Sequence, residues 1–477
     1  MVAATRARAA GEVTGVNSTG LDPQDGNEAG PLDRLLGLFG DVRPGEGARA
    51  VLMLANIFLI LVSYYIIKTV REPLILTTSV PETLQRLGIH TAPEVKTYAA
   101  AAQALILMAY VPAYSWFASR VDRMRLILGL TAFFVANIVA FALAVRMDVD
   151  HIGVYFYVWV GLFSLSIIAQ FWSYANDVYT KEAGDRLFPI IGLGMTIGSP
   201  VGSWIAGHMF EAHIAPPAML YVAGALLATS AVVYVRINRG ATRRGTTAAV
   251  QKPIEGRSGF TLVFASRYIG LIALLLVLLN VVNTTGEFIL SDLVVARAAR
   301  GAAANPAFDK NAFIGSFYGS YFLWVNIAAV LLQALVASRL VRRFGLAGVL
   351  FALPFIALGA YGIVALGATL SIVRWAKTAE NATDYSVMNT AKQLLWLPTS
   401  REEKYKAKQA VDSFFFRFGD LTAAAVVFVG TTWLGLQARG FAGVNLGFVI
   451  VWLVVAAVLV GENQRLAAKA GGEPAAR

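Results

Sequence analysis

Residues 370–395 read LSIVRWAKTAENATDYSVMNTAKQLL, and the topology of the whole chain depends on whether this segment crosses a membrane. It is long enough, since a spanning helix needs about 20 residues. Hydropathy alone would assign it to a loop, because it carries Arg374, Lys377, Glu380, Asp384 and Lys392. On a helix, at about 100° per residue, these charges and Asn381 fall within an arc of about 120°. A helix that lines an aqueous cavity keeps such a stripe, so we predict a span here; the alternative is an amphipathic helix on the membrane surface.

The rest of the chain has the composition of a membrane protein. Its 477 residues are 57% hydrophobic and 14% charged, whereas a soluble domain is about 25% charged. This excludes a water-soluble globular protein, and it makes the net charge of +11 a sign of basic cytoplasmic loops, not of nucleic-acid binding. The absence of cysteine excludes thiol catalysis and zinc–thiolate sites. We expect no metal, cofactor or catalytic residue, since the four histidines lack metal-ligand spacing and no nucleophile–base pair stands out.

Windows of about 20 apolar residues predict an all-α integral membrane protein with about twelve transmembrane helices. The spans are 50–72, 98–118, 126–146, 153–176, 189–210, 217–236, 268–292, 313–337, 346–367, 370–395, 411–435 and 441–461. With both termini inside, 27 of the 40 Lys and Arg residues fall on the cytoplasmic side and 7 on the other. This bias predicts a multi-pass protein of the bacterial inner membrane with both termini in the cytoplasm. Without the tenth span, the basic residues at 401–408 would lie outside.

The chain also shows signs of two equivalent halves. The turn Ala118-Ser119-Arg120 follows the second span, and Ala337-Ser338-Arg339 follows the eighth. Paired halves are typical of transporters in which a central site lies between two repeats, although basic turns recur in any membrane protein. We predict a disordered cytoplasmic N-tail, two pseudo-symmetric six-helix halves joined by a cytoplasmic linker, and a cytoplasmic C-tail, at 1–49, 50–236, 237–266, 267–461 and 462–477.

Several other spans carry polar side chains on one helix face. The first has Tyr64, Lys68 and Arg71, which alternatively snorkel to the outer interface. The fourth has Gln170, Ser173, Tyr174 and Asp177, with Asn176 beside them, and the alternative there is hydrogen bonding between helices. The seventh has a carboxylate at depth, in the stripe Asn280, Asn283, Thr284, Glu287 and Ser291, which structural pairing would also explain. The eleventh adds a possible ion pair, Arg417 with Asp420.

Charges inside a membrane are costly and usually face a cavity or a partner. Several Lys and Arg residues around one cavity suit a polyanion, and arginine binds phosphate oxygens in pairs. No P-loop sequence is present, which favours transport by exchange, facilitation or ion coupling. We predict as substrate-binding residues Lys68, Arg71, Asn176, Asn283, Glu287, Arg374, Lys377, Asp384, Lys392 and Arg417. Possible ion-coupling residues are Glu287, Asp177 and Asp384.

Four local motifs recur in one known family. The first motif runs from Tyr65 to Glu72. The second runs from Phe171 to Asp177 and includes Glu182 and Arg186 to Pro189. The third is Glu287, and the fourth runs from Asp384 to Gly419. Over about 50–461 the chain resembles the nucleotide transporter family of ATP/ADP translocases, which is distantly similar to the major facilitator superfamily. The resemblance implies a divergent bacterial member, nucleotide exchange, and substrate roles for Arg71, Glu287 and Lys392. The chain departs from the family pattern at Val160, Gln393 and Asp420.

These observations leave three hypotheses. The first is a secondary transporter of a nucleotide or related organophosphate that works by alternating access. The second has the same fold but is a proton-coupled symporter of another organic anion, with Glu287 as the proton site. The third is a non-transporting membrane sensor or scaffold. We expect a phosphorylated small anion and the lipid bilayer as partners, no nucleic acid, and a monomer. The substrate, the coupling ion and the direction of transport stay open.

Overall fold

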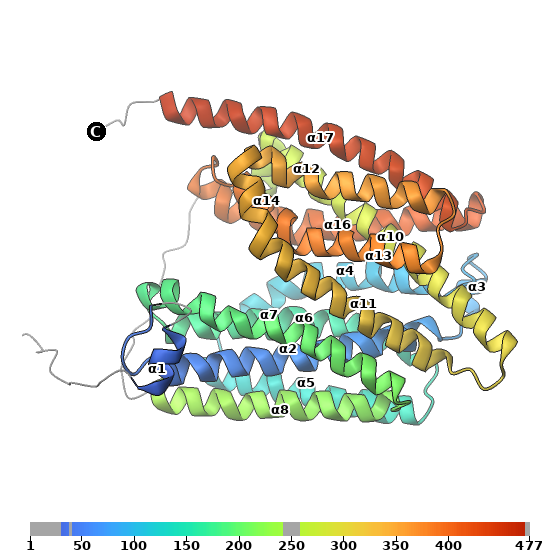
Figure 1. Ribbon diagram of the computed structural model, residues 1–477, viewed down its shortest axis with the longest axis horizontal. Helices are drawn as coiled ribbons and strands as arrows, with labels where there is room; N and C mark the ends of the chain where they lie inside the picture. Colours follow the sequence, from blue (N-terminus) through green and yellow to red (C-terminus); the bar gives the residue numbers. More distant parts are fainter. Residues whose placement is uncertain (1–29, 38–40, 242–257, 473–477) are drawn as a thin grey trace, which may run out of the picture.

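The computed structural model describes residues 30–37, 41–241 and 258–472, and its regular structure in those ranges is helical (Figure 1). The first half contains α2 (Gly47–Leu76), α4 (Ala92–Ala118), α5 (Arg123–Arg146), α6 (Ile152–Val178), α7 (Lys181–Glu211) and α8 (Pro216–Ala241). The second contains α10 (Arg267–Ala304), α11 (Lys310–Leu332), α12 (Ser338–Ala365), α13 (Leu370–Thr383), α14 (Asn389–Leu395), α16 (Phe416–Phe428) and α17 (Ala438–Gly472). Short π-helical segments connect or extend several of these helices: η2 (Gln333–Ala337), η3 (Asp384–Met388), η4 (Glu403–Ala407), η5 (Val411–Phe415) and η6 (Val429–Trp433). The remaining α-helices are short: α1 (Pro31–Leu36), α3 (Glu82–Gln85), α9 (Gly259–Ala265) and α15 (Lys408–Ala410).

The number of membrane passes agrees with the sequence. Ten segments of the described chain are long and apolar enough to cross a membrane. One of them, Lys310–Ala365, is two helices joined at Gly345, whose φ of +60° and ψ of −147° interrupt the helix. Glycine adopts such a conformation without the clash that a Cβ would cause. The tenth predicted span is not among the ten because of its charges, yet it runs as a continuous helix from Leu370 to Leu395 through η3. The prediction of an all-α fold with about twelve spans is confirmed.

The helices form two bundles that lie side by side. Within the first, α2 packs against α7 and α8, and within the second, α17 packs against α10 and α12. Figure 1 shows α1 and the end of α17 at one end of the molecule and α3 at the other; we call these the α1 end and the α3 end. The bundles converge toward the α3 end and diverge toward the α1 end (Figure 1).

The most extensive contacts between the bundles are those of α7 with α11 and of α4 with α16, and α2 with α11 and α4 with α10 add smaller ones. Where α7 meets α11 the backbones touch, because a Cβ on Gly319 would lie 2.5 Å from the Cα of Gly207. Nearer the α3 end, the hydroxyl of Thr77 donates to the Asn311 side-chain oxygen at 3.1 Å. The hydrogen bonds and ion pairs made between the halves, so far as the described ranges go, lie in the middle of the bundle and toward the α3 end. The α3 end is therefore the closed end.

The predicted domain boundaries can be compared with the helices only in part. Residues 1–29, 242–257 and 473–477 lie outside the described residues, so the boundaries of the tails and linker stay predictions. The structure differs at 30–37, where the predicted disordered tail contains α1. Asp33 accepts backbone N–H groups of Gly45 and Gly47, at 3.1 and 2.8 Å, and of Gly30. These hydrogen bonds, that from Gly45 first, lower the pKa of Asp33 and tie α1 to the start of α2.

The glycine contact between α7 and α11 generates a prediction about the closed end. The substitution Gly319→Val should force the two helices apart, because even a Cβ meets backbone at 2.5 Å. The chain has no cysteine, so the pair Thr77→Cys and Asn311→Cys can report closure by oxidative cross-linking. We expect Gly319→Val to reduce the cross-linked fraction several-fold. Gly359→Val, on α12 with open space around the site, is the matched control; an equal effect of both variants would contradict the assignment.

Candidate functional site

A cavity of about 630 Å³ lies between the two bundles, near the middle of the spanning helices. Both halves line it, through α2, α4 and α6 on one side and α10, α11, α13, η3 and α16 on the other. Six of the predicted substrate-binding residues are in its lining: Lys68, Arg71, Asn283, Glu287, Asp384 and Arg417. Two more, Lys377 and Lys392, contact lining residues directly. The structure thus brings eight of the ten together.

The first half contributes two cations on one face of α2, as the helical spacing predicts. Arg71 lies over the ring of Tyr157, 4.3 Å from its centroid, and pairs with Glu72 at 2.6 Å. Lys68 lies 4.3 Å from the centroid of the Phe322 ring, which belongs to the second half. Within the described part of the chain, Lys68 makes no ion pair. Its ammonium therefore faces the cavity with aromatic rings as neighbours and no carboxylate to neutralise it.

A lysine at the cavity wall is ion-paired within the first half and hydrogen-bonded to the second. The Nζ of Lys96 lies 2.7 Å from Glu72 and donates to the hydroxyl of Ser291, on α10, at 2.9 Å. Because Glu72 also holds Arg71, the contact connects the cavity to the closed end. Lys96 was not predicted as a site residue, because the second predicted span begins at residue 98. The capping signal Thr91 to Glu94 would have moved the start earlier, since each of these side chains bonds the other's backbone N–H.

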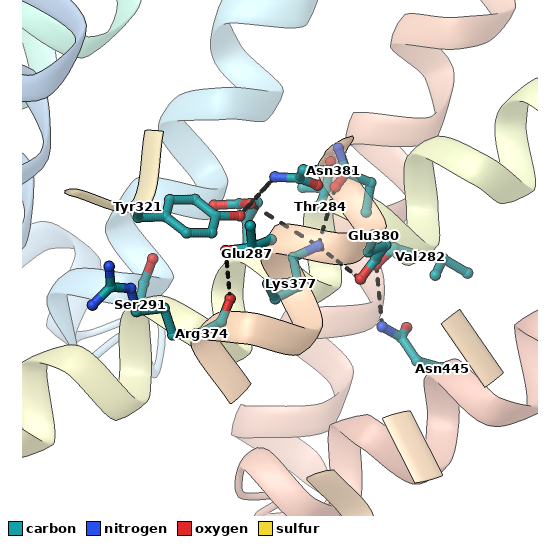
Figure 2. Close-up of polar contacts among 12 residues, drawn as sticks. Val282, Thr284, Glu287, Ser291, Tyr321, Arg374, Lys377, Glu380, Asn381 and Asn445 are labelled. Carbon is teal, nitrogen blue, oxygen red and sulfur yellow. Dashed lines mark hydrogen bonds and ion pairs between the residues drawn. The ribbon is translucent and has the colours of Figure 1, made fainter. Parts of the chain in front are cut away.

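In the second half, two carboxylates share one lysine (Figure 2). The Nζ of Lys377 lies 3.1 Å from Glu380 and 4.0 Å from Glu287. The side chain of Glu380 is 4% exposed and accepts a hydrogen bond from the Tyr361 hydroxyl, whereas that of Glu287 is 25% exposed and faces the cavity. Asn381 donates to Glu287 at 3.0 Å. Glu380 is part of the predicted polar stripe but was not singled out as a site residue.

The remaining cations of the cavity each have an acid beside them. Lys392 lies 3.1 Å from Asp384, and Arg417 lies 3.7 Å from Asp420. The hydroxyl of Thr284 donates to Asp420 at 2.9 Å. Both regions are marked by π-helical turns, since η3 begins at Asp384 and η5 ends just before α16, which carries Arg417. Such turns are frequent at functional sites, where they change the direction in which side chains point.

Arg374 is directed elsewhere. It extends from α13 away from Lys377 and Glu380 (Figure 2) and donates to the hydroxyl of Ser320, on α11, at 2.7 Å. It lines a different pocket, described below. The physical reason is the width of the predicted stripe. An arc of about 120° is wide enough for one edge of a helix to face a different neighbour from the other edge.

Asn176 and Asp177 also lie apart from the cavity. They are in the last turn of α6, at the α1 end, where Asn176 is exposed. Asp177 pairs at 2.7 Å with Arg123, which begins α5, and the same arginine donates to Ser173. The exposed ends of α5 and α6 are thus joined by this ion pair. The coupling role predicted for Asp177 has no counterpart among the contacts of the cavity.

Comparison with known proteins identifies relatives of this chain. No protein-family model matches it. ADP,ATP carrier protein 1 of Chlamydia pneumoniae is 24% identical over 358 residues, which are 64% of this chain and 66% of that protein. ADP,ATP carrier protein 3 of Rickettsia conorii is 20% identical over 326 residues, 57% and 61% of the two chains. The chain is a divergent relative of these ADP,ATP carriers. It spans just under two thirds of the length of the carriers it matches.

Solved structures show the same fold. The nucleoside transporter NupG superposes with a TM-score of 0.62 at 13% identity, covering 87% of this chain and 98% of that one. The POT family transporter PepTSo superposes with a TM-score of 0.60 at 13% identity, covering 88% and 98%. The fold is therefore that of major-facilitator-type transporters.

The shared lysine generates a prediction about stability. Lys377→Met should lower the thermal unfolding midpoint strongly, because breaking a buried ion pair by removing one partner costs about 3–5 kcal/mol. Adding Glu380→Gln should recover part of the loss, since the unpaired buried charge is then gone. Thermal unfolding of the detergent-purified variants measures both effects. A double variant no more stable than Lys377→Met would contradict the pairing.

Proposed function

We propose that this protein moves a nucleotide or a related phosphorylated small anion across the bacterial inner membrane by alternating access. The observation that carries the proposal is the central cavity, in which Lys68 has no carboxylate partner among the described residues and stands beside Arg71. A volume of about 630 Å³ lies in the range of small-molecule sites, about 300–1,000 Å³. The printed function of the relatives, ADP,ATP carriers, supports the same substrate class.

The cations of the cavity come from both halves, so a bound substrate would contact both halves at once. Lys68 and Arg71 lie on α2, whereas Arg417 and Lys392 lie beyond the linker, on α16 and α14. A polyanion held by both sets draws the halves together around it. The arginine guanidinium can donate two parallel hydrogen bonds to two oxygens of one phosphate, and the lysine ammonium adds a compact positive charge. We infer that phosphate groups bind between Lys68, Arg71 and Arg417, with Lys392 released from Asp384 to join them.

The aromatic lining suits a base. Tyr157, Phe322, Tyr385 and Phe416 all line the cavity, from both halves. In proteins that bind single-stranded nucleic acid, stacking of a base on such a side chain contributes about 1–3 kcal/mol and tolerates every base. Asn283, held by Lys377 at 3.2 Å, offers polar contacts to a base or a sugar.

The acids beside the cations explain how the substrate anion can be released. When the anion leaves, Asp384 and Asp420 neutralise Lys392 and Arg417, as in the present arrangement. The closed α3 end and the basic α1 end together support a cytoplasm-open state, if the excess of basic residues marks the cytoplasm. We place both termini there and expect a monomer, because one chain supplies both halves of the cavity.

One observation favours the second candidate, proton-coupled symport of an organic anion. Glu287 and Glu380 share Lys377, so one of the two carboxylates lacks a full counter-charge and could hold a proton instead. Glu287 faces the cavity and is the accessible member of the pair. Exchange and symport differ in what drives uptake: a counter-substrate inside the vesicle or an imposed pH gradient. A sensor or scaffold role is not favoured, since the relatives are carriers.

Transport assays test the proposal. Proteoliposomes loaded with ADP should take up labelled ATP or ADP, and Lys68→Gln should weaken binding about 10- to 100-fold, because a hydrogen bond to a charged group contributes about 1.5–3 kcal/mol. Lys310→Gln, an exposed lysine at the start of α11, is the matched control. Uptake that requires internal ADP indicates exchange, and uptake driven by a pH gradient and lost in Glu287→Gln indicates symport. No uptake of any nucleotide, with no thermal shift on adding one, would contradict the nucleotide assignment.

A further inference from the structure

A second pocket lies outside the central cavity, in the second half at the α3 end. Its volume is about 580 Å³, and it is lined by α10, α11, α13 and the turn before α13. Arg297, Arg300 and Arg374 are all in its lining, which contains no Asp or Glu. A pocket of this size with three guanidinium groups and no acid carries a net positive charge.

The three arginines have few partners. Within the described ranges none of them makes an ion pair. The Nε of Arg300 donates to its own helix, at the carbonyl of Ala296, and Nη2 of Arg374 donates to Ser320. The Nε of Arg374 is buried and has no hydrogen-bond partner. A buried donor without a partner is costly, so this N–H favours a hydrogen-bond acceptor in the pocket.

The start of α13 adds backbone donors to the same pocket. Thr369, Leu370 and Ser371 line it, and Thr369 is the N-cap residue but makes no side-chain cap hydrogen bond. The first N–H groups of a helix are unsatisfied and favour an anion. These backbone donors add to the positive charge of the three arginines and to the unpartnered Nε of Arg374.

The position of the pocket matches a membrane interface. The 38 residues of α10 extend about 57 Å at 1.5 Å per residue, far more than the hydrocarbon thickness of about 30 Å. Arg297 and Arg300 lie in the final turns of α10, beyond that thickness. Trp375 lines the pocket and is half exposed, and its ring centroid lies 5.7 Å from that of Trp324, which is also exposed. Tryptophan at this level is typical of the headgroup region.

We propose that this pocket binds a phosphate group at the membrane surface on the α3 side, through Arg297, Arg300, Arg374 and the start of α13. The phosphate belongs either to an anionic phospholipid or to a soluble phosphate. The lipid-facing tryptophans suit the first source and an open approach from water the second. The site is separate from the central cavity and holds whether or not the proposed nucleotide transport is correct.

Lipid and phosphate titrations of the delipidated, detergent-purified full chain test this site. We expect phosphatidylglycerol, or else inorganic phosphate, to raise the thermal unfolding midpoint, with phosphatidylcholine and chloride as the respective references. The variant Arg297→Gln/Arg300→Gln should raise the apparent Kd at least tenfold. Native mass spectrometry should count less phosphatidylglycerol bound to it. Arg146→Gln, an exposed arginine that ends α5 at the same end of the molecule, is the matched control.

The two titrations, with phosphatidylglycerol and with inorganic phosphate, distinguish the two sources of the phosphate group. A response to phosphatidylglycerol that the double variant loses assigns a lipid headgroup, and a response to inorganic phosphate alone that it loses assigns a soluble anion. Arg374→Gln is a second variant for the same titrations if the double variant unfolds at lower temperature without ligand. Equal responses of wild type, both variants and the Arg146→Gln control, or no response to either ligand, would overturn the proposal.

Discussion

Charges inside the hydrocarbon layer must be paired or hydrated, and this requirement organises the second half of the protein. Placing a charged side chain there costs several kcal/mol unless a partner or water stabilises it. Lys377 with its two glutamates, Lys392 with Asp384, and Arg417 with Asp420 each meet the requirement at the walls of one cavity. A helix as polar as α13 can cross the membrane only because its neighbours supply these partners. The fold and the site therefore have the same physical origin.

The exception to this pairing points to the substrate. Lys68 has aromatic rings beside it and no ion pair in the described chain, so the cavity retains a positive charge that an anion can neutralise. Glu72 connects this region to Lys96 and, through Ser291, to the second half. An anion that binds Arg71 competes with Glu72 and thereby changes the contact that joins the halves. In the proposed transport cycle, this competition would couple binding of the anion to movement of the halves.

The sequence predicted the fold better than it predicted the site. The periodicity of residues 370–395 identified a membrane helix that hydropathy misses, and the helical spacing placed Lys68 and Arg71 on one face of α2. The same periodicity could not tell which neighbour each edge of a helix faces, so Arg374 was assigned to the cavity although it contacts α11. Asn176 was included because its neighbours share a face, but the end of α6 where it lies is exposed. Lys96 was missed because the first turn of α4 is polar, and a hydropathy window assigns such a turn to a loop.

In the proposed mechanism, an anion draws the two halves together at the α1 end. Distances between spin labels measure this directly in a chain that has no cysteine of its own. One pair, Ser119→Cys and Ser338→Cys, lies at the α1 end, with Ser119 just after α4 and Ser338 at the start of α12, and both residues are exposed. In proteoliposomes, saturating ADP or ATP should shorten the distance between these labels, and Lys68→Gln should abolish the shortening at the same concentration. A distance that no nucleotide or phosphorylated anion changes, or that changes equally with Lys68→Gln, would contradict the account.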